Sequence, residues 1–126
     1  MKFLFNSELD FIEIHMVLYG VRELKVKAVL DTGSNNMILV PRLVEPLGLG
    51  LLERKSHIIT VGGTYKVPKI SIPKIYALGY ELLDVEALAF ELPEKIGVEA
   101  ILGLKFFRRF KQLNLNFKQN FVEILR

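Results

Sequence analysis

Asp31 is the residue of this chain whose type and surroundings most favour chemistry. It follows the apolar run at residues 28–30 and precedes Thr32, Gly33 and Ser34. A carboxylate at the inner end of an apolar strand is costly to ionise unless hydrogen-bond donors surround it. The hydroxyls and backbone N–H groups of this tight turn are such donors, as acid–base catalysis by a tuned carboxylate requires. The same residues also make an ordinary turn after a strand, so other parts of the chain must decide between the two.

Other candidate groups favour simpler interpretations. His15 and His57 are the only histidines and lie far apart, and there is no cysteine, so we expect no metal site, no thiol nucleophile and no cofactor. Asp84 and Glu86 would share one face of a strand. They could form a paired-carboxylate site, but a solvated strand face is the simpler interpretation.

Two further segments could bind anions. Residues 105–111 mix cations with aromatics, which could contact RNA or an anionic membrane. A helix that buries three phenylalanines and solvates its cations explains the same pattern. Gly62 and Gly63 lack the further glycine spacing and the Lys-Ser/Thr pair of a phosphate-binding loop. With a net charge of only +3, no nucleic-acid partner is expected.

The composition is that of a globular protein. The 126 residues are 51% hydrophobic and 25% charged, which predicts a single domain over residues 1–126. The apolar start at residues 1–5 is interrupted by Asn6, Ser7 and Glu8, and no apolar run is long enough to span a bilayer. We therefore expect a cytoplasmic protein without a membrane segment.

The order of elements is mainly β. The patterns predict strands over residues 11–19, 22–30, 37–40, 57–61, 65–70, 70–78, 80–90, 99–102, 113–117 and 121–125. The first two strands form a hairpin that delivers Asp31 to its end. A helical turn is predicted over residues 41–48, a Gly-Gly hairpin at residues 62–64, a loop over residues 92–97 and a C-terminal helix over residues 104–112. Together these elements indicate a closed β-barrel-like domain with one real helix.

The order of these features resembles the retropepsin-like (retroviral-type) aspartic proteases over about residues 11–125. The most specific features are the Asp-Thr-Gly-Ser at residues 31–34 and the Ile-Leu-Gly at residues 101–103, with the glycine hairpin between them. The resemblance implies an acid-protease fold with a flap hairpin. Lys105, where the family often has an acidic residue, and Asn35 and Asn36 depart from the common pattern.

The resemblance also implies roles for individual residues. Asp31 would be the catalytic carboxylate, Thr32 would bond to the partner loop, Gly33 would admit the substrate backbone, and Ser34 would donate to the outer oxygen of Asp31. The flap tip and substrate-binding residues would be Val61, Gly62, Gly63 and Thr64. Structural support from behind would come from Ile101, Leu102 and Gly103, with the helix below them.

The number of aspartates adds a constraint of its own. Hydrolysis by this route needs two carboxylates that share a proton. Of the three aspartates, Asp10, Asp31 and Asp84, only Asp31 lies in a Thr-Gly turn. One chain therefore holds half a site, which predicts an obligate two-fold homodimer. The terminal segments 2–5 and 121–125 are the predicted interface strands.

The predicted function is an aspartic endopeptidase acting on polypeptides. Apolar pockets would be lined by residues of the flap and neighbouring strands, which favours cleavage between hydrophobic residues; these are Val40, Ile58, Ile59, Val61, Tyr65, Val67, Leu83 and Val85. The alternative is a retropepsin-like module kept for dimerisation or peptide binding, with little or no hydrolysis.

Overall fold

The computed structural model covers residues 1–126 and describes the side chains of all of them except residues 53 and 54. Its strands are β1 (Phe3–Leu4), β2 (Glu13–Tyr19), β3 (Glu23–Leu30), β4 (Ile38–Leu39), β5 (Gly50–Thr60), β6 (Gly63–Ala77), β7 (Tyr80–Ala89), β8 (Ala100–Leu102), β9 (Gln112–Asn116) and β10 (Phe121–Leu125). The helices are α1 (Val44–Leu47) and α2 (Leu104–Phe107), with 3-10 turns at Pro41–Leu43 and Glu94–Ile96.

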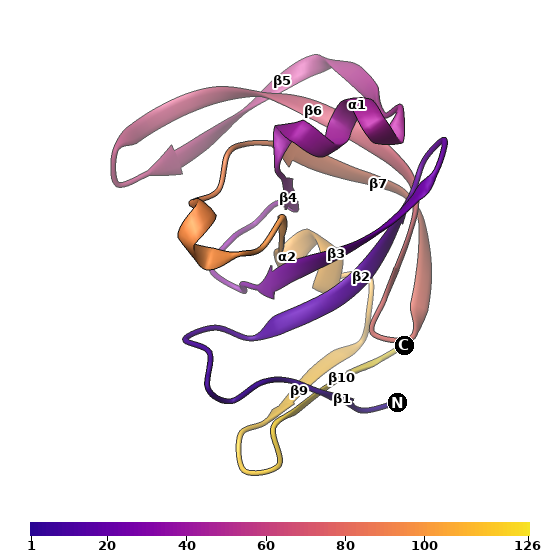
Figure 1. Cartoon of the computed structure of the whole chain (residues 1–126), viewed down its shortest axis with the longest axis vertical. Helices are drawn as coiled ribbons and strands as arrows, with labels where there is room; N and C mark the ends of the chain where they lie inside the picture. Colours follow the sequence, from indigo (N-terminus) through magenta and orange to yellow (C-terminus); the bar gives the residue numbers. More distant parts are fainter.

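Six strands close into a barrel. They follow the order β2-β3-β8-β4-β7-β6, and a pairing between β6 and β2 completes the ring. The remaining strand of this sheet, β5, pairs with the first part of β6, and these paired segments project together as a long hairpin (Figure 1). The closed, mainly β barrel with a projecting hairpin confirms the fold predicted from the sequence.

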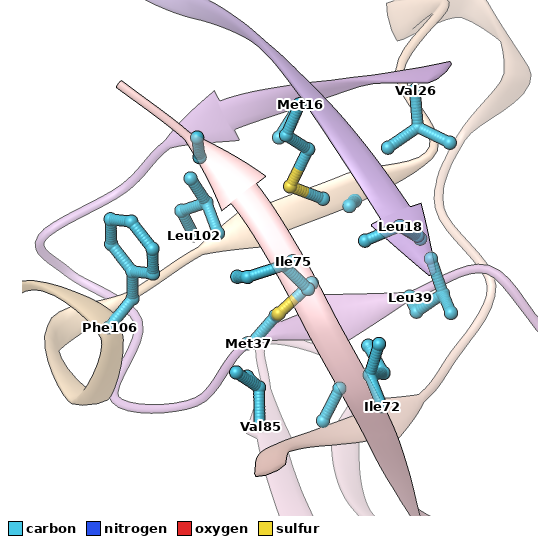
Figure 2. Close-up of a cluster of buried hydrophobic side chains, with 14 of the residues drawn as sticks. Met16, Leu18, Val26, Met37, Leu39, Ile72, Ile75, Val85, Leu102 and Phe106 are labelled. Carbon is cyan, nitrogen blue, oxygen red and sulfur yellow. The ribbon is translucent and has the colours of Figure 1, made fainter. Parts of the chain in front are cut away.

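The barrel interior is filled by the apolar residues that alternate along its strands. In β2 the buried positions are Ile14, Met16 and Leu18, whereas His15 points to solvent. Strand side chains alternate between the two faces of a sheet, so this spacing fixes which face packs inward. Both residues of β4 are buried, as the short apolar run at residues 37–40 predicted. Figure 2 shows the central cluster, to which β2, β4, β6, β7 and β8 all contribute.

The structure has one long strand, β6, where the sequence predicted two. Residues 65–70 and 70–78 are continuous in β6, which pairs first with β5 and then with β7 and β2. The chain reverses at Leu78 and Gly79, whose φ angles are 52° and 87°. Two successive positive φ angles are typical of the tight turn that suits strand twist.

The C-terminal helix is confirmed but much shorter than predicted. The α-helix ends at Phe107, whereas the sequence predicted a helix over residues 104–112. After it, Arg109 and Phe110 donate to carbonyls three residues back, so the chain continues in tight turns until β9 begins. Phe110 then packs on Tyr80 and Phe106, with ring centroids 5.2 and 5.5 Å apart, so it lies against the core although the helix has ended.

The predicted helical turn at residues 41–48 is present as a 3-10 turn followed by α1. Pro41 begins it, and Gly48 ends it with a φ of 63°, the left-handed conformation that glycine adopts at helix ends. In the part of the chain whose side chains are described, no helix is long and apolar enough to cross a membrane.

A separate sheet joins the two ends of the chain. Its order is β1-β10-β9, and it lies at the opposite end of the long axis from the β5–β6 hairpin (Figure 1). Because β10 is paired on both sides within its own chain, its backbone edges are already occupied. The sequence had predicted residues 121–125 as an interface strand; in this structure only β1 and β9 retain a free edge in the sheet.

Candidate active site

The carboxyl ends of β3 and β8 bring the two sequence motifs together. These strands are parallel, with Ala28 opposite Ala100 and Leu30 opposite Leu102. The next residue of β3 is Asp31, whose backbone N–H donates to the Leu102 carbonyl at 3.0 Å. The Asp-Thr-Gly-Ser and Ile-Leu-Gly motifs, about seventy residues apart in sequence, are therefore adjacent in space.

The turn after β3 orients the carboxylate of Asp31. The Gly33 N–H donates to Asp31 Oδ1 at 2.9 Å, and the Ser34 N–H donates to the Asp31 carbonyl at 3.1 Å. Asp31 is half-buried, whereas Thr32 and Gly33 are exposed. A hydrogen bond from a backbone N–H stabilises an ionised carboxylate and fixes its direction. The carboxylate is thus fixed at one oxygen and remains reachable from outside.

Ser34 does not make the contact implied by the resemblance. Its hydroxyl donates to the Asn36 carbonyl at 2.9 Å, rather than to the outer oxygen of Asp31. The local turn brings the carbonyl two residues ahead within reach, and such short-range bonds are favoured for serine. In the single chain Ser34 therefore stabilises the loop that carries Asp31.

Gly103 lets the Asp31 loop pack closely against β8. A Cβ atom on Gly103 would lie 2.4 Å from the Ser34 carbonyl oxygen and 2.6 Å from that of Asn36. The N–H groups of Leu104 and Lys105 donate to the carbonyls of Ser34 and Asn35 at 2.8 and 2.9 Å. Only glycine leaves room for this approach, because any side chain would collide with backbone oxygens.

The backbone contacts of Asn35, Asn36 and Lys105 were not predicted. In the sequence these residues are departures from a family pattern, yet each contributes through its main chain. Backbone hydrogen bonds depend on position and hardly on side-chain type, so no sequence pattern could have indicated them.

The tip of the β5–β6 hairpin is a two-residue loop at Val61 and Gly62. Thr60 pairs with Gly63, so the turn lies one residue earlier than the predicted Gly62–Thr64 tip. Of the two glycines, only Gly63 has a positive φ, 131°. The Gly62 N–H donates to the Thr60 hydroxyl at 3.1 Å, and all four residues from Val61 to Thr64 are exposed.

An aromatic contact connects this hairpin to the barrel near the Asp31 loop. The rings of Tyr65 and Phe90 lie edge to face with centroids 5.7 Å apart. The Phe90 N–H donates to the Leu39 carbonyl at 3.1 Å, and β4 directly follows the loop that begins at Asp31. The sequence analysis placed Phe90 at the end of a strand but assigned it no part in the site.

The residues predicted to line apolar pockets differ in burial, and Ile58 on β5 is half-buried. Val40, Val67 and Val85 are buried, and Val85 packs in the core cluster. Leu83 is exposed but lies beside Arg109, whose guanidinium donates to its carbonyl at 2.9 Å. The hairpin residues with accessible apolar surface are Ile59, Val61 and Tyr65.

The other candidate groups do not form sites with one another. His15 lies on β2, with its Nε2 3.0 Å from Glu13, whereas His57 lies on β5 opposite Lys66. Glu86 approaches Lys69 at 3.8 Å. These contacts fit a surface role for the two histidines and a solvated strand face for the two carboxylates.

The fold and the site together define a class of protein. A closed β-barrel with an Asp-Thr-Gly-Ser turn packed on an Ile-Leu-Gly strand end is the arrangement of retropepsin-like aspartic proteases. Residues 20–109 match the family described as "gag-polyprotein putative aspartyl protease". The chain belongs to this family.

Two solved structures share the fold. A retropepsin-like aspartic protease from Rickettsia conorii superposes with a TM-score of 0.71 at 18% identity, covering 99% of this chain and 89% of that one. EIAV protease, complexed with the inhibitor HBY-793, gives a TM-score of 0.61 at 19% identity, covering 79% of this chain and 88% of that one. The search of curated proteins gave no significant match.

Proposed function

We propose that this protein is an aspartic endopeptidase whose active site is completed by a second copy of the chain. The observation that carries the proposal is the Asp31 carboxylate, half-buried and oriented by the Gly33 N–H at 2.9 Å. The loop around it is fixed by β8 and α2 through backbone hydrogen bonds. Preorganised donors and a positioned carboxylate are what general acid–base catalysis requires.

The need for a second copy follows from the positions of the three aspartates. Asp10 lies in the exposed loop before β2, and Asp84 lies on β7, so neither joins Asp31 at the end of β3. A two-fold axis beside Asp31 would bring the carboxylates of two chains together. The β1-β10-β9 sheet offers the free edges of β1 and β9, together with exposed Leu4 and Phe117, for an obligate homodimer.

In the proposed mechanism the two Asp31 carboxyl groups share one proton. The ionised group removes a proton from a water molecule, whose oxygen attacks the peptide carbonyl carbon, while the protonated group donates to the carbonyl oxygen. Collapse of the tetrahedral intermediate breaks the C–N bond, and the leaving nitrogen receives a proton from the dyad. A peptide carboxyl group and an amine are released.

The remaining site residues would position the substrate. Thr32 would bond to the partner loop, and the exposed Gly33 would allow the peptide backbone to approach. The flap would be residues 61–64 at the tip of the β5–β6 hairpin, closing over the peptide. The exposed side chains of Ile59, Val61 and Tyr65 favour hydrophobic residues beside the scissile bond.

The test compares the wild-type protein with Asp31→Asn in a peptide-library digest from about pH 4 to 8. We expect Asp31→Asn to lose at least about 10²-fold in hydrolysis, because the amide can neither accept nor share the proton. The wild-type activity should be bell-shaped in pH, since one proton must be present and the other absent. Sedimentation of both samples should show dimers.

Three outcomes would contradict the proposal. Hydrolysis that survives Asp31→Asn would remove the catalytic assignment, and a monomer with full activity would remove the dimer. Cleavage only beside charged residues would contradict the substrate preference. A dimer that binds the peptides without cleaving them would instead support a dimerisation or peptide-binding module.

A further inference from the structure

A cavity lies behind the Asp31 loop, between β7 and α2. Its volume is about 290 Å³, and its apolar wall consists of Met37, Leu82, Val85 and Phe106. Figure 2 shows Met37, Val85 and Phe106 on one side of the core cluster. Cavities for drug-sized ligands measure about 300–1,000 Å³, so this one, just below that range, suits only a small ligand of one or two residues.

The rim of this cavity carries charges of both signs. Asp84 and Glu86 contribute from β7, and Lys105 and Arg109 contribute from α2 and the turn after it. Glu86 lies near Lys69, and Arg109 donates to the carbonyls of Leu83 and Asp84 at 2.9 and 3.2 Å. Among the side chains that the structure describes, no ion pair involves Asp84 or Lys105. One carboxylate and one ammonium group are thus available at the rim.

Asp84 also has a strained backbone. Its φ is 52° in the middle of β7, where the register places it opposite Pro73. Proline has no N–H for the ladder, which explains a local break but does not explain why aspartate stands there. Glycine would adopt this φ at less cost. Strain of this kind is concentrated at functional sites, which draws attention to the Asp84 carboxylate.

The cavity shares its wall with the candidate active site. Met37 directly follows the Asp31 loop, and its carbonyl accepts from the Leu88 N–H at 2.9 Å. The Lys105 N–H donates to the Asn35 carbonyl at 2.9 Å, so the residue at the rim also holds the loop. A ligand here would contact segments that position Asp31.

We propose that this cavity binds an amino acid or dipeptide with an apolar side chain and both ends free. The ligand's ammonium group meets Asp84, its carboxylate meets Lys105, and its side chain packs on the wall formed by Met37, Val85 and Phe106. Opposite charges flanking an apolar floor match this chemistry. Short apolar peptides are also products of peptide hydrolysis, and this identification of their source rests on the proposed function.

The test uses the dipeptide Leu-Phe and NMR titration of the Asp31→Asn variant, which separates binding from hydrolysis. We expect the amide signals of Met37, Val85, Lys105 and Phe106 to shift on binding. Asp84→Gly and Lys105→Gln should each weaken binding at least about 5-fold, since each removes a charged contact. Acetylating the amine or amidating the carboxylate of the dipeptide should likewise weaken binding, because each change removes one charge of the ligand. Glu94→Gln and Lys118→Gln, which change exposed charges elsewhere, serve as matched controls.

The Asp84→Gly variant separates a ligand role from a structural one. Glycine relieves the strain of the positive φ, so the melting temperature should stay equal or rise while the affinity for the dipeptide falls. Unchanged binding by Asp84→Gly would overturn the proposal, as would shifts confined to residues 61–64 or displacement of the dipeptide by a peptidomimetic inhibitor directed at Asp31. A wild-type protein without peptidase activity would refute the proposed function and leave this binding result intact.

Discussion

The Asp31 loop and the tip of the β5–β6 hairpin differ in what holds them in place. The loop donates a hydrogen bond to β8 and accepts hydrogen bonds from α2, and it passes so close to Gly103 that a single added carbon would collide with it. The hairpin tip bonds mainly to itself, through Thr60, Gly62 and Gly63, and its side chains project into solvent. One region belongs to the core of the barrel, and the other stands apart from it.

This difference assigns separate tasks to the two regions. Segments with few buried contacts open at low free energy, whereas core segments open only with the whole domain. A catalytic carboxylate must be held in one geometry, and a cover over the substrate must move to admit it. In the proposed enzyme the loop would supply the fixed group, and the hairpin would supply the moving cover.

Removing apolar side chains should give the largest difference in stability between the strand that follows the Asp31 loop and the hairpin. Leu39 is fully buried in β4, so Leu39→Ala should lower the free energy of unfolding by about 2–5 kcal/mol. Ile59 is 82% exposed, so Ile59→Ala should change it by no more than about 0.5 kcal/mol. Urea denaturation measures both. Equal losses would mean that the hairpin is part of the cooperative core.

The next effect concerns the contact between β8 and the Asp31 loop. Gly103→Ala should destabilise the protein by about 1–3 kcal/mol, because the new Cβ meets backbone oxygens that cannot turn away. Peptidase activity should fall further than stability alone explains, since the loop itself is displaced. Gly50→Ala is the matched control, because nothing lies within 4 Å of the added carbon. If Gly103→Ala behaved like this control, the tight packing would be refuted.

A local effect is expected at the hairpin turn. Gly63 has a φ of 131° and open space around it, so Gly63→Ala adds conformational strain of about 1–3 kcal/mol without a collision. Hydrogen exchange should become faster in the amides of the hairpin, while the global unfolding midpoint changes little. Faster exchange throughout the barrel strands as well would show that the two regions are coupled.

The smallest effect on stability should come from Val61→Ala at the tip. Val61 is fully exposed, so the free energy of unfolding should change by less than about 0.5 kcal/mol. Under the proposed function the KM for apolar peptides should nevertheless rise, because the flap loses apolar contact with the substrate. Steady-state kinetics decide this point, and an unchanged KM would remove Val61 from the substrate contacts.

Much of the barrel could be predicted because its strands carry clear alternation and clear turns. The hairpin ending at Asp31, the buried residues of β4 and the Gly48 helix end all follow from local patterns. The errors occurred where distant contacts override local preference. The helix ends at Phe107 and the chain turns so that Phe110 packs on Tyr80, and β6 is continuous because different partners pair with its two halves.

The sequence by itself determined the chemistry that this protein can offer. It supplied one aspartate in a Thr-Gly turn, an Ile-Leu-Gly strand end and no cysteine, and these are properties of residue type and order. Only the tertiary structure decided that the two motifs touch and that β10 lies between β1 and β9, whereas the bond from Ser34 to Asn36 is local to the turn. The first two outcomes depend on strand register and close backbone approach, which join residues too distant in sequence for any local pattern to specify.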